Sequence, residues 1–206
     1  MADQITPGTT AHDTHLTPAL LDAAVRDATQ ALARGLEADW NTRALGLEWS
    51  CRRTAEHIAD CHVSYALLVA GRRTDSYLPI DLTLSGRVEP RAIIEVLEGT
   101  GALLSAVLAT SPADAVVWHP YGRADLSAVA GMGIIETLVH TWDITQTLGV
   151  DFTPTDEVCA QVVLRMFPEA EVGDDPWQTL LWATGRAELP GRPQRGDWQW
   201  TNDLSV

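Results

Sequence analysis

The segment AGMGIIETLVHTWDITQTLG, residues 130–149, decides the fold. When it is wound with about 3.6 residues per turn, apolar side chains cover most of the helix circumference. A helix that is apolar on nearly every side lies at the centre of a protein, because a surface helix keeps one polar face. The segment therefore predicts a central helix over residues 126–148, which stops at Gly149.

Three amphipathic segments precede the central helix and predict its neighbours. They cover residues 17–36, 50–70 and 90–110, and each begins with a capping residue or with proline in its first turn. Two of the connections between the four helices are long. Four helices with long crossovers predict an all-α four-helix bundle over residues 17–150.

The rest of the chain predicts an arm and an appendage rather than a second large domain. Residues 1–16 are rich in polar residues and predict a flexible N-terminal arm. Residues 151–206 predict a short helical appendage, with helices near 155–166 and 176–184 followed by an extended tail. The alternating stretch 77–84 predicts either an irregular crossover or a short strand pair.

Composition limits the partners that the protein can have. The net charge is -14, all the basic residues are arginine, and three cysteines are present. An acidic surface repels phosphates and anionic lipids, and no run of about 18 apolar residues occurs, so we expect neither nucleic-acid nor membrane binding. Three cysteines are too few for a disulfide framework, which favours the reducing cytoplasm.

Glu136 and His140 are the strongest chemical signal. They lie four residues apart and therefore face the same way on the central helix. A carboxylate on an apolar helix is costly to bury unless a partner compensates its charge, and a metal ion is one such partner. A buried hydrogen bond or a plain ion pair between the two residues is the alternative.

His57 can complete a three-ligand set from another helix. It lies on the edge of the apolar stripe of residues 50–70, and bundle interiors build metal sites from facing helices. By itself such a histidine is more often a hydrogen-bonded core residue than a metal ligand. His62 follows His57 by five residues, about 140° round the helix, so it is not expected to join the same site.

Two patterns carry a resemblance to a known family. W-x7-H occurs in WSCRRTAEHIADCHV, residues 49–63, and E-x3-H-x-W-D-x5-G occurs in residues 130–149. Together they resemble the DinB-like superfamily, and more narrowly its mycothiol-dependent maleylpyruvate isomerase branch, over most of residues 17–150. DPWQTLLWATGR, residues 175–186, resembles the region after the bundle in related actinobacterial metal-binding proteins.

The resemblance implies a metal-dependent enzyme. It implies the bundle fold, the ligands His57, Glu136 and His140, and a catalytic divalent ion, with mycothiol as co-substrate. Zinc is the expected ion, although nickel, iron and manganese accept the same donor set. The expected reaction is isomerisation or S-transfer on a small electrophile, because a metal ion stabilises an incoming thiolate.

Four further residues are candidates for the same site. Asp143 lies three residues after His140 and can orient its ring, or it can be a helix-packing acid. The predicted loop 111–124 holds His119, a candidate acid–base catalyst whose alternative is a surface histidine. Tyr121 and Arg123 share that loop and are candidate substrate contacts.

Two other functional classes stay open at this point. Water in place of the thiol predicts a metal-dependent hydrolase on the same bundle. A non-catalytic metal-binding or small-molecule-binding protein is the other alternative. The eight tryptophans can line its ligand pocket, form the interface of a homodimer, or simply pack in the core.

Overall fold

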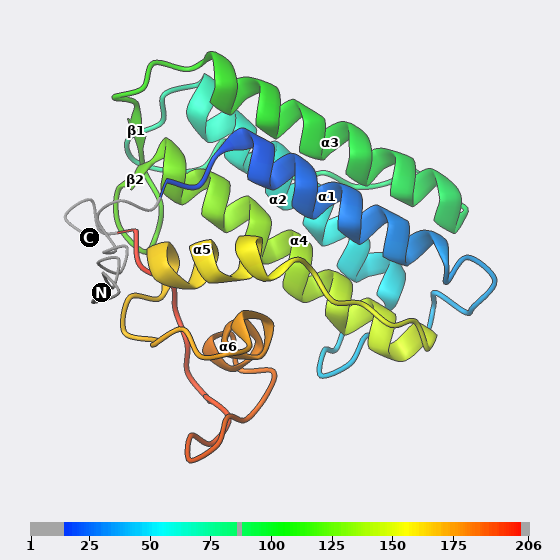
Figure 1. Ribbon diagram of the computed structural model, residues 1–206. Coiled ribbons are helices and arrows are strands. Elements are labelled where there is room, and N and C mark those ends of the chain that lie inside the picture. The colour runs from blue at the N-terminus through cyan, green and yellow to red at the C-terminus, as the bar shows by residue number, and fades with distance from the viewer. Residues whose placement is uncertain (1–14, 86–87, 203–206) are drawn as a thin grey trace, which may run out of the picture.

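Four long helices lie side by side and form the body of the protein (Figure 1). The computed structural model describes residues 15–85 and 88–202. Each of α1 and α2 packs against both α3 and α4, which closes the bundle. The predicted all-α four-helix bundle is therefore confirmed. Its helices are α1 (Pro18–Ala33), α2 (Cys51–Ala70), α3 (Pro90–Thr110) and α4 (Leu126–Leu148).

The ends of these helices agree closely with the capping residues in the sequence. The side chains of Thr17 and Ser50 each accept a backbone N–H in the first turn of the helix that follows. Gly149 ends α4 in the left-handed conformation with φ 69°. The expected ends of the second, third and fourth helices are thus observed.

The first helix is shorter than the sequence predicts: it ends at Ala33 instead of residue 36. The chain turns at Gly35 against the end of α4, where a Cβ atom would lie 3.0 Å from Leu148 Cδ1. The following turn is held by Trp40, whose Nε1 donates to Gly35 O at 3.0 Å. Apolar periodicity continues through this turn, so it overestimates the length of the helix.

Helix α4 is the central helix that its composition predicts. Sixteen of its 23 residues are buried, including residues on all sides. Its small residues allow close packing: a Cβ atom on Gly131 would lie 2.6 Å from Met166 Sδ of the neighbouring helix α5 (Asp156–Met166). Polar side chains on α4 are consequently held inside the protein.

The described residues of the crossover between α2 and α3 are extended and form no strand. Its backbone N–H groups at Leu82 and Leu84 donate to Asp60 and Glu56 of α2, both at 2.6 Å. Side-chain carboxylates therefore satisfy donors that a partner strand would otherwise take. The only strands in the described ranges are the two-residue pair β1 (Val116–Val117) and β2 (Ala124–Asp125), in the stretch expected to be a loop.

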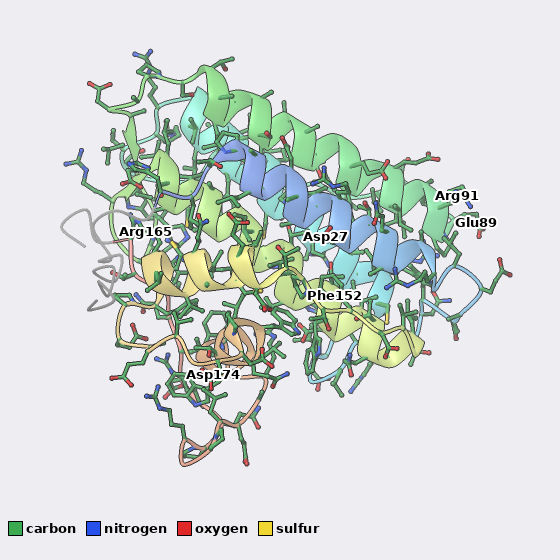
Figure 2. The ribbon with its side chains drawn as sticks, viewed as in Figure 1. Asp27, Glu89, Arg91, Phe152, Arg165 and Asp174 are labelled. Atoms are coloured by element: carbon green, nitrogen blue, oxygen red, sulfur yellow. The ribbon has the colours of Figure 1, made fainter. Side chains whose placement is uncertain are left out.

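The C-terminal segment packs along α4. Arg165 of α5 is buried and pairs with Asp125 at 3.2 Å, at the start of α4. Phe152, which is labelled in Figure 2, packs against Trp177 of α6 (Pro176–Ala183), with ring centroids 6.0 Å apart. The extended tail then returns past α5, so α5, α6 and the tail cover one side of the bundle (Figure 1).

The structure describes only the end of the predicted N-terminal arm. Most of the predicted arm, residues 1–14, lies outside the described residues, while Leu16 is buried and its backbone N–H donates to Ser127 Oγ at 2.9 Å.

Among the described residues, one helix, α3, has the length and apolar composition of a membrane span. Because core helices of water-soluble bundles pass the same test, and α3 packs on α1 and α2, this is weak evidence for a span.

Candidate metal centre

Three side chains with metal-binding donors meet between α2 and α4. His57 comes from α2, and Glu136 and His140 come from successive turns of α4. One donor atom from each lies within 4.8 Å of the others. Glu136 Oε2 lies 3.2 Å from His140 Nε2 and 3.5 Å from His57 Nε2. Two imidazole nitrogens and one carboxylate oxygen form a donor set that fits a divalent transition metal.

Glu136 is held as a carboxylate by its two histidine neighbours. Its side chain is only 13% exposed. Burial alone would raise its pKa, but hydrogen bonds and charge from His140 and His57 lower the pKa well below its ordinary value. The group is therefore negatively charged at neutral pH and is available to a cation.

His140 is fixed from its other side by Asp143. Nδ1 of His140 donates to Asp143 Oδ2 at 2.9 Å, which leaves Nε2 directed at Glu136. Burial would lower the pKa of His140, but the bonds to Asp143 and Glu136 raise it to about 9. This carboxylate–histidine arrangement is the one that orients metal-bound histidines in proteins.

Arg186 compensates the charge of Asp143. Its Nε and one terminal nitrogen donate to the two carboxylate oxygens of Asp143 at 3.1 and 2.8 Å. Asp143 is 1% exposed, so without this fork its charge would be costly. Arg186 follows α6 in the chain and therefore links the C-terminal segment to the candidate centre.

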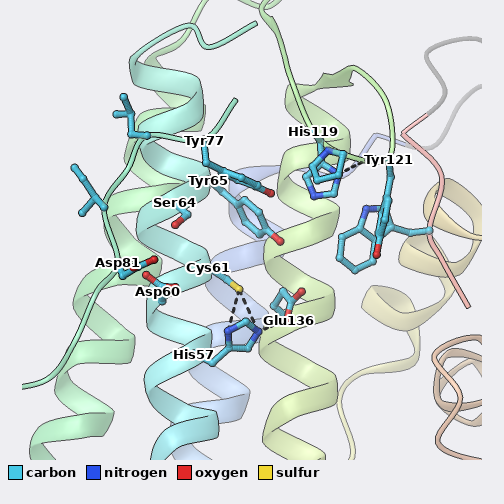
Figure 3. A pocket seen from close by; sticks show the side chains of 14 residues that line it. His57, Asp60, Cys61, Ser64, Tyr65, Tyr77, Asp81, His119, Tyr121 and Glu136 are labelled. Carbon is cyan, nitrogen blue, oxygen red and sulfur yellow. Dashed lines mark hydrogen bonds and ion pairs between the residues drawn. The ribbon is translucent and has the colours of Figure 1, made fainter. Parts of the chain in front are cut away.

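A cavity of about 430 Å³ opens on the Glu136 side of the centre (Figure 3). We call it the tyrosine cavity. His57 and Glu136 form its inner end, and aromatic rings form much of its wall. Among the described residues that line it, none is lysine or arginine. Its other members are Asp60, Cys61, Ser64, Tyr65, Tyr77, Leu78, Ile80, Asp81, His119, Pro120, Tyr121 and Trp200.

A second cavity, of about 600 Å³, opens on the His140 side. We call it the Arg186 cavity, and it shares His57 with the tyrosine cavity. The ring of Trp49 lies against that of His57 in its wall, with the centroids 4.9 Å apart and the ring planes inclined by 60°. The centre therefore lies between two openings. The other lining residues are Leu45, Gly46, Leu47, His140, Trp142, Asp143, Thr184, Gly185, Gln194 and Trp198.

The loop residues predicted from the sequence are only partly brought to the centre. His119 and Tyr121 line the tyrosine cavity, and His119 is 5% exposed rather than a surface histidine. Burial lowers the pKa of His119 to about 4, so the ring is neutral. Arg123 is exposed and lines neither cavity, so the geometry gives no support to its predicted substrate contact.

Two other α2 side chains, Cys61 and His62, have defined neighbours and shifted pKa values. Cys61 lies 3.5 Å from His57 Nε2, and burial, followed by the charge of Glu136, raises the pKa of its thiol well above the ordinary value. His62 points elsewhere, as expected, and is bonded to Thr100 and Thr137 at 3.2 and 2.8 Å. Burial lowers its pKa to about 4.

Sequence reasoning did not assign Arg186 or Trp200 to the site. Arg186 closes the quoted segment DPWQTLLWATGR, but nothing in that segment shows that it reaches Asp143, 43 residues earlier. Trp200 lies in a tail whose tryptophans were compatible with a pocket, an interface or the core. Only the path of the folded chain distinguishes these possibilities.

The sequence matches a known protein family. The sequence model of the DinB superfamily matches residues 21–144, which contain α1 to α4 up to His140 and Asp143. The chain belongs to the DinB superfamily. No curated protein matches the sequence significantly. The predicted superfamily is thus confirmed, on the part of the chain that carries the candidate ligands.

Two solved structures of another protein are similar in fold to this DinB protein over most of its chain. The crystal structure of the mycothiol-dependent maleylpyruvate isomerase matches with a TM-score of 0.55 and 18% identity. A mutant of that isomerase matches with a TM-score of 0.56 and 16% identity. Each match covers 90% of this chain and 99% of the other. The similarity in fold therefore extends past the bundle into the C-terminal segment.

Proposed function

We propose that this DinB protein is a metal-dependent enzyme that uses a low-molecular-weight thiol of the mycothiol type. In this proposal it catalyses isomerisation or S-transfer on a small electrophilic substrate. The observation that carries the proposal is the meeting of His57, Glu136 and His140 between two cavities. The fold of the mycothiol-dependent isomerase supports the same class of reaction.

The residues fit a divalent ion, for which we propose zinc. His57 and His140 would supply nitrogen ligands and Glu136 a carboxylate oxygen, while Asp143 keeps Nδ1 of His140 protonated. A divalent ion bound there would stabilise the thiolate form of a thiol near neutral pH. Three protein ligands leave positions open, which is typical of catalytic rather than structural sites.

The two cavities suit two substrates. The Arg186 cavity combines indole rings with Gln194 and Thr184, and this mixture suits a polar, sugar-like thiol. The tyrosine cavity has the more aromatic wall and suits the electrophile. Both reach His57, so the sulfur and the carbon that it attacks can meet at the centre.

His119 is the proposed proton-bearing group. Its Nδ1 accepts the backbone N–H of Tyr121 at 3.1 Å, so the proton of the neutral ring is on Nε2. With a pKa of about 4, His119 serves better as a hydrogen-bond donor to developing negative charge than as a proton reservoir. Tyr121 positions this ring.

The test is consumption of the thiol. Zinc-loaded protein is incubated with mycothiol and a panel of electrophiles, and free thiol is followed beside the Glu136→Gln variant and the metal-free protein. We expect consumption only with wild type and metal. Absence of both mycothiol binding and thiol consumption would contradict the proposal, and thiol-independent ester or amide cleavage would favour a hydrolase.

The compartment and the partners follow from the same proposal. Cys51, Cys61 and Cys159 are all free and buried, which agrees with a cytoplasmic protein. Small molecules are the proposed partners, and a homodimer stays a prediction, which sedimentation at micromolar concentration would test.

A further inference from the structure

The wall of the tyrosine cavity beyond the metal group carries no positive charge. Its charged side chains there are the carboxylates Asp60 and Asp81, and neither lysine nor arginine occurs among the described lining residues. Asp60 accepts the backbone N–H of Leu82, a neutral donor that does not cancel its charge. In Figure 3 the two carboxylates lie on one side of the cavity, opposite His119 and Tyr121. Anionic groups in this part of the cavity would therefore be repelled.

The opposite side of the cavity offers neutral N–H donors. Nε2 of His119 carries the proton, because Nδ1 accepts from the backbone of Tyr121. Trp200 is 6% exposed, and its Nε1 is buried without a hydrogen-bond partner among the described residues. A buried donor without an acceptor costs free energy, which an acceptor on a ligand recovers.

These donors are set in a continuous aromatic wall. The ring of His119 lies 5.7 Å from that of Trp200 and 6.1 Å from that of Tyr77, centroid to centroid. Tyr121 closes the group, 5.4 Å from Trp200. Such a wall favours a flat or apolar ligand and excludes water from around its polar atom.

We propose that the electrophile of this enzyme is an uncharged α,β-unsaturated carbonyl compound with an aromatic or apolar body. Its carbonyl oxygen accepts from His119 or Trp200, and its body lies among the tyrosine rings. The inference rests on the proposed function, and it adds the charge and the functional group of the substrate. A substrate with two carboxylates, such as maleylpyruvate, is disfavoured by the same wall.

The chemical step balances without an oxidant or a reductant. The thiol sulfur forms a bond to the β-carbon, and the electron pair of the C=C bond shifts toward the carbonyl oxygen. The thiol proton ends on the α-carbon, and reversal by elimination would isomerise the double bond. The N–H donors stabilise the negative charge that develops on the carbonyl oxygen during this step.

Binding of cinnamamide and cinnamate to the metal-free protein tests the inference. The two ligands share a phenyl ring and a conjugated C=C bond, and they differ in a neutral amide against a carboxylate. We expect cinnamamide to bind at least about tenfold more tightly by calorimetry at low salt, because like charges repel cinnamate. Equal affinity, tighter binding of cinnamate, or no binding of either at 10 mM would overturn the inference.

Two variants connect the selectivity to named side chains. Trp200→Phe keeps a ring but removes the N–H, and we expect about fivefold weaker binding of cinnamamide. Asp81→Arg should raise the affinity for cinnamate about threefold or more. Asp81 is exposed, so this change spares the core, and Asp22→Arg on the exposed face of α1 is the control for net charge. No change in either affinity would also overturn the inference.

This experiment is independent of the thiol chemistry. It needs neither metal nor mycothiol, so loss of the proposed enzymatic function would leave the binding result intact. Conversely, thiol consumption with charged electrophiles only, together with tighter binding of cinnamate, would retain the enzyme and reject the neutral substrate.

Discussion

Two histidines at the contact between α2 and α4, one fully buried and one largely so, have opposite character. His62 is fully buried between the hydroxyl groups of Thr100 and Thr137, and its pKa is lowered to about 4. His140 lies between Asp143 and Glu136, and its pKa is raised to about 9. Burial is common to both, so the partners decide which histidine is a neutral packing residue and which can serve a metal.

The two sites are built from neighbouring residues. Thr137 follows Glu136 directly in α4 but turns to His62, while Glu136 turns to His57. A step of one residue rotates a side chain by about 100° around a helix, which separates the carboxylate site from the hydroxyl site. The predictions below test this separation, from the largest expected effect to the smallest.

Removal of His140 should abolish metal binding. His140→Ala deletes one of the three proposed donors, and we expect zinc affinity to fall by more than about 100-fold, beyond the usual cost of losing an outer partner. A chelator competition titration measures it. His62→Ala is the matched control and should keep its affinity within about threefold. Equal loss in both variants would erase the distinction between the two histidines.

His62→Ala should instead lower the stability of the fold. The change removes hydrogen bonds to Thr100 and Thr137 and leaves a void, and we expect the free energy of unfolding to fall by about 2–3 kcal/mol. Urea denaturation of the metal-free protein measures it. If unfolding were unaffected while zinc binding failed, His62 would belong to the functional site.

Asp143→Asn should weaken metal binding less than loss of a ligand. The amide can still accept from His140 Nδ1 but loses the negative charge, and it leaves Arg186 without its ion pair. We expect zinc affinity to fall about 10–100-fold. Asp174→Asn, at an exposed acid, is the control. An unchanged affinity would return Asp143 to the role of a helix-packing acid.

The two histidines should also differ in their response to pH. The folded pKa of His140, about 9, exceeds the ordinary value of about 6.5. Its stabilisation of the metal-free protein is therefore complete below about pH 6.5 and is lost as pH rises through 9. Because zinc displaces the same proton, zinc affinity should rise about tenfold per unit between pH 7 and 9.

The measurement is zinc titration and denaturation in parallel over pH 6 to 9. His62 is neutral over this whole range because its pKa is about 4, so it contributes to neither slope. A flat zinc affinity over the range would mean that no proton leaves His140 on binding.

Replacement of Cys61 should have the smallest effect. Its sulfur lies near His57, but burial keeps it as a thiol, which is a poor ligand beside imidazole and carboxylate. We expect Cys61→Ser to change zinc affinity by less than about threefold. A larger loss, with a sulfur-to-metal charge-transfer band in the cobalt-substituted wild type, would make Cys61 a fourth ligand.

Much of the fold was predictable from local patterns. Capping residues, glycine stops and helical periodicity depend on neighbours within about four residues, so they located the ends of α2, α3 and α4. The predicted end of α1 was wrong by about a turn, because the close approach of Gly35 to Leu148 at the end of α4 is a tertiary contact that local pattern does not reveal. The strand pair β1–β2 was missed because each strand has only two residues.

By itself, then, the sequence determined the bundle, and it placed Glu136 and His140 on one face with His57 as a candidate partner. Helix geometry converts spacing into direction, which makes such inferences possible. Only the tertiary structure decided that Arg186 pairs with Asp143, that Trp200 lines the tyrosine cavity, and that Arg123 lies away from it. These facts depend on the path of the loops and the C-terminal tail, whose contacts join residues that no local period relates.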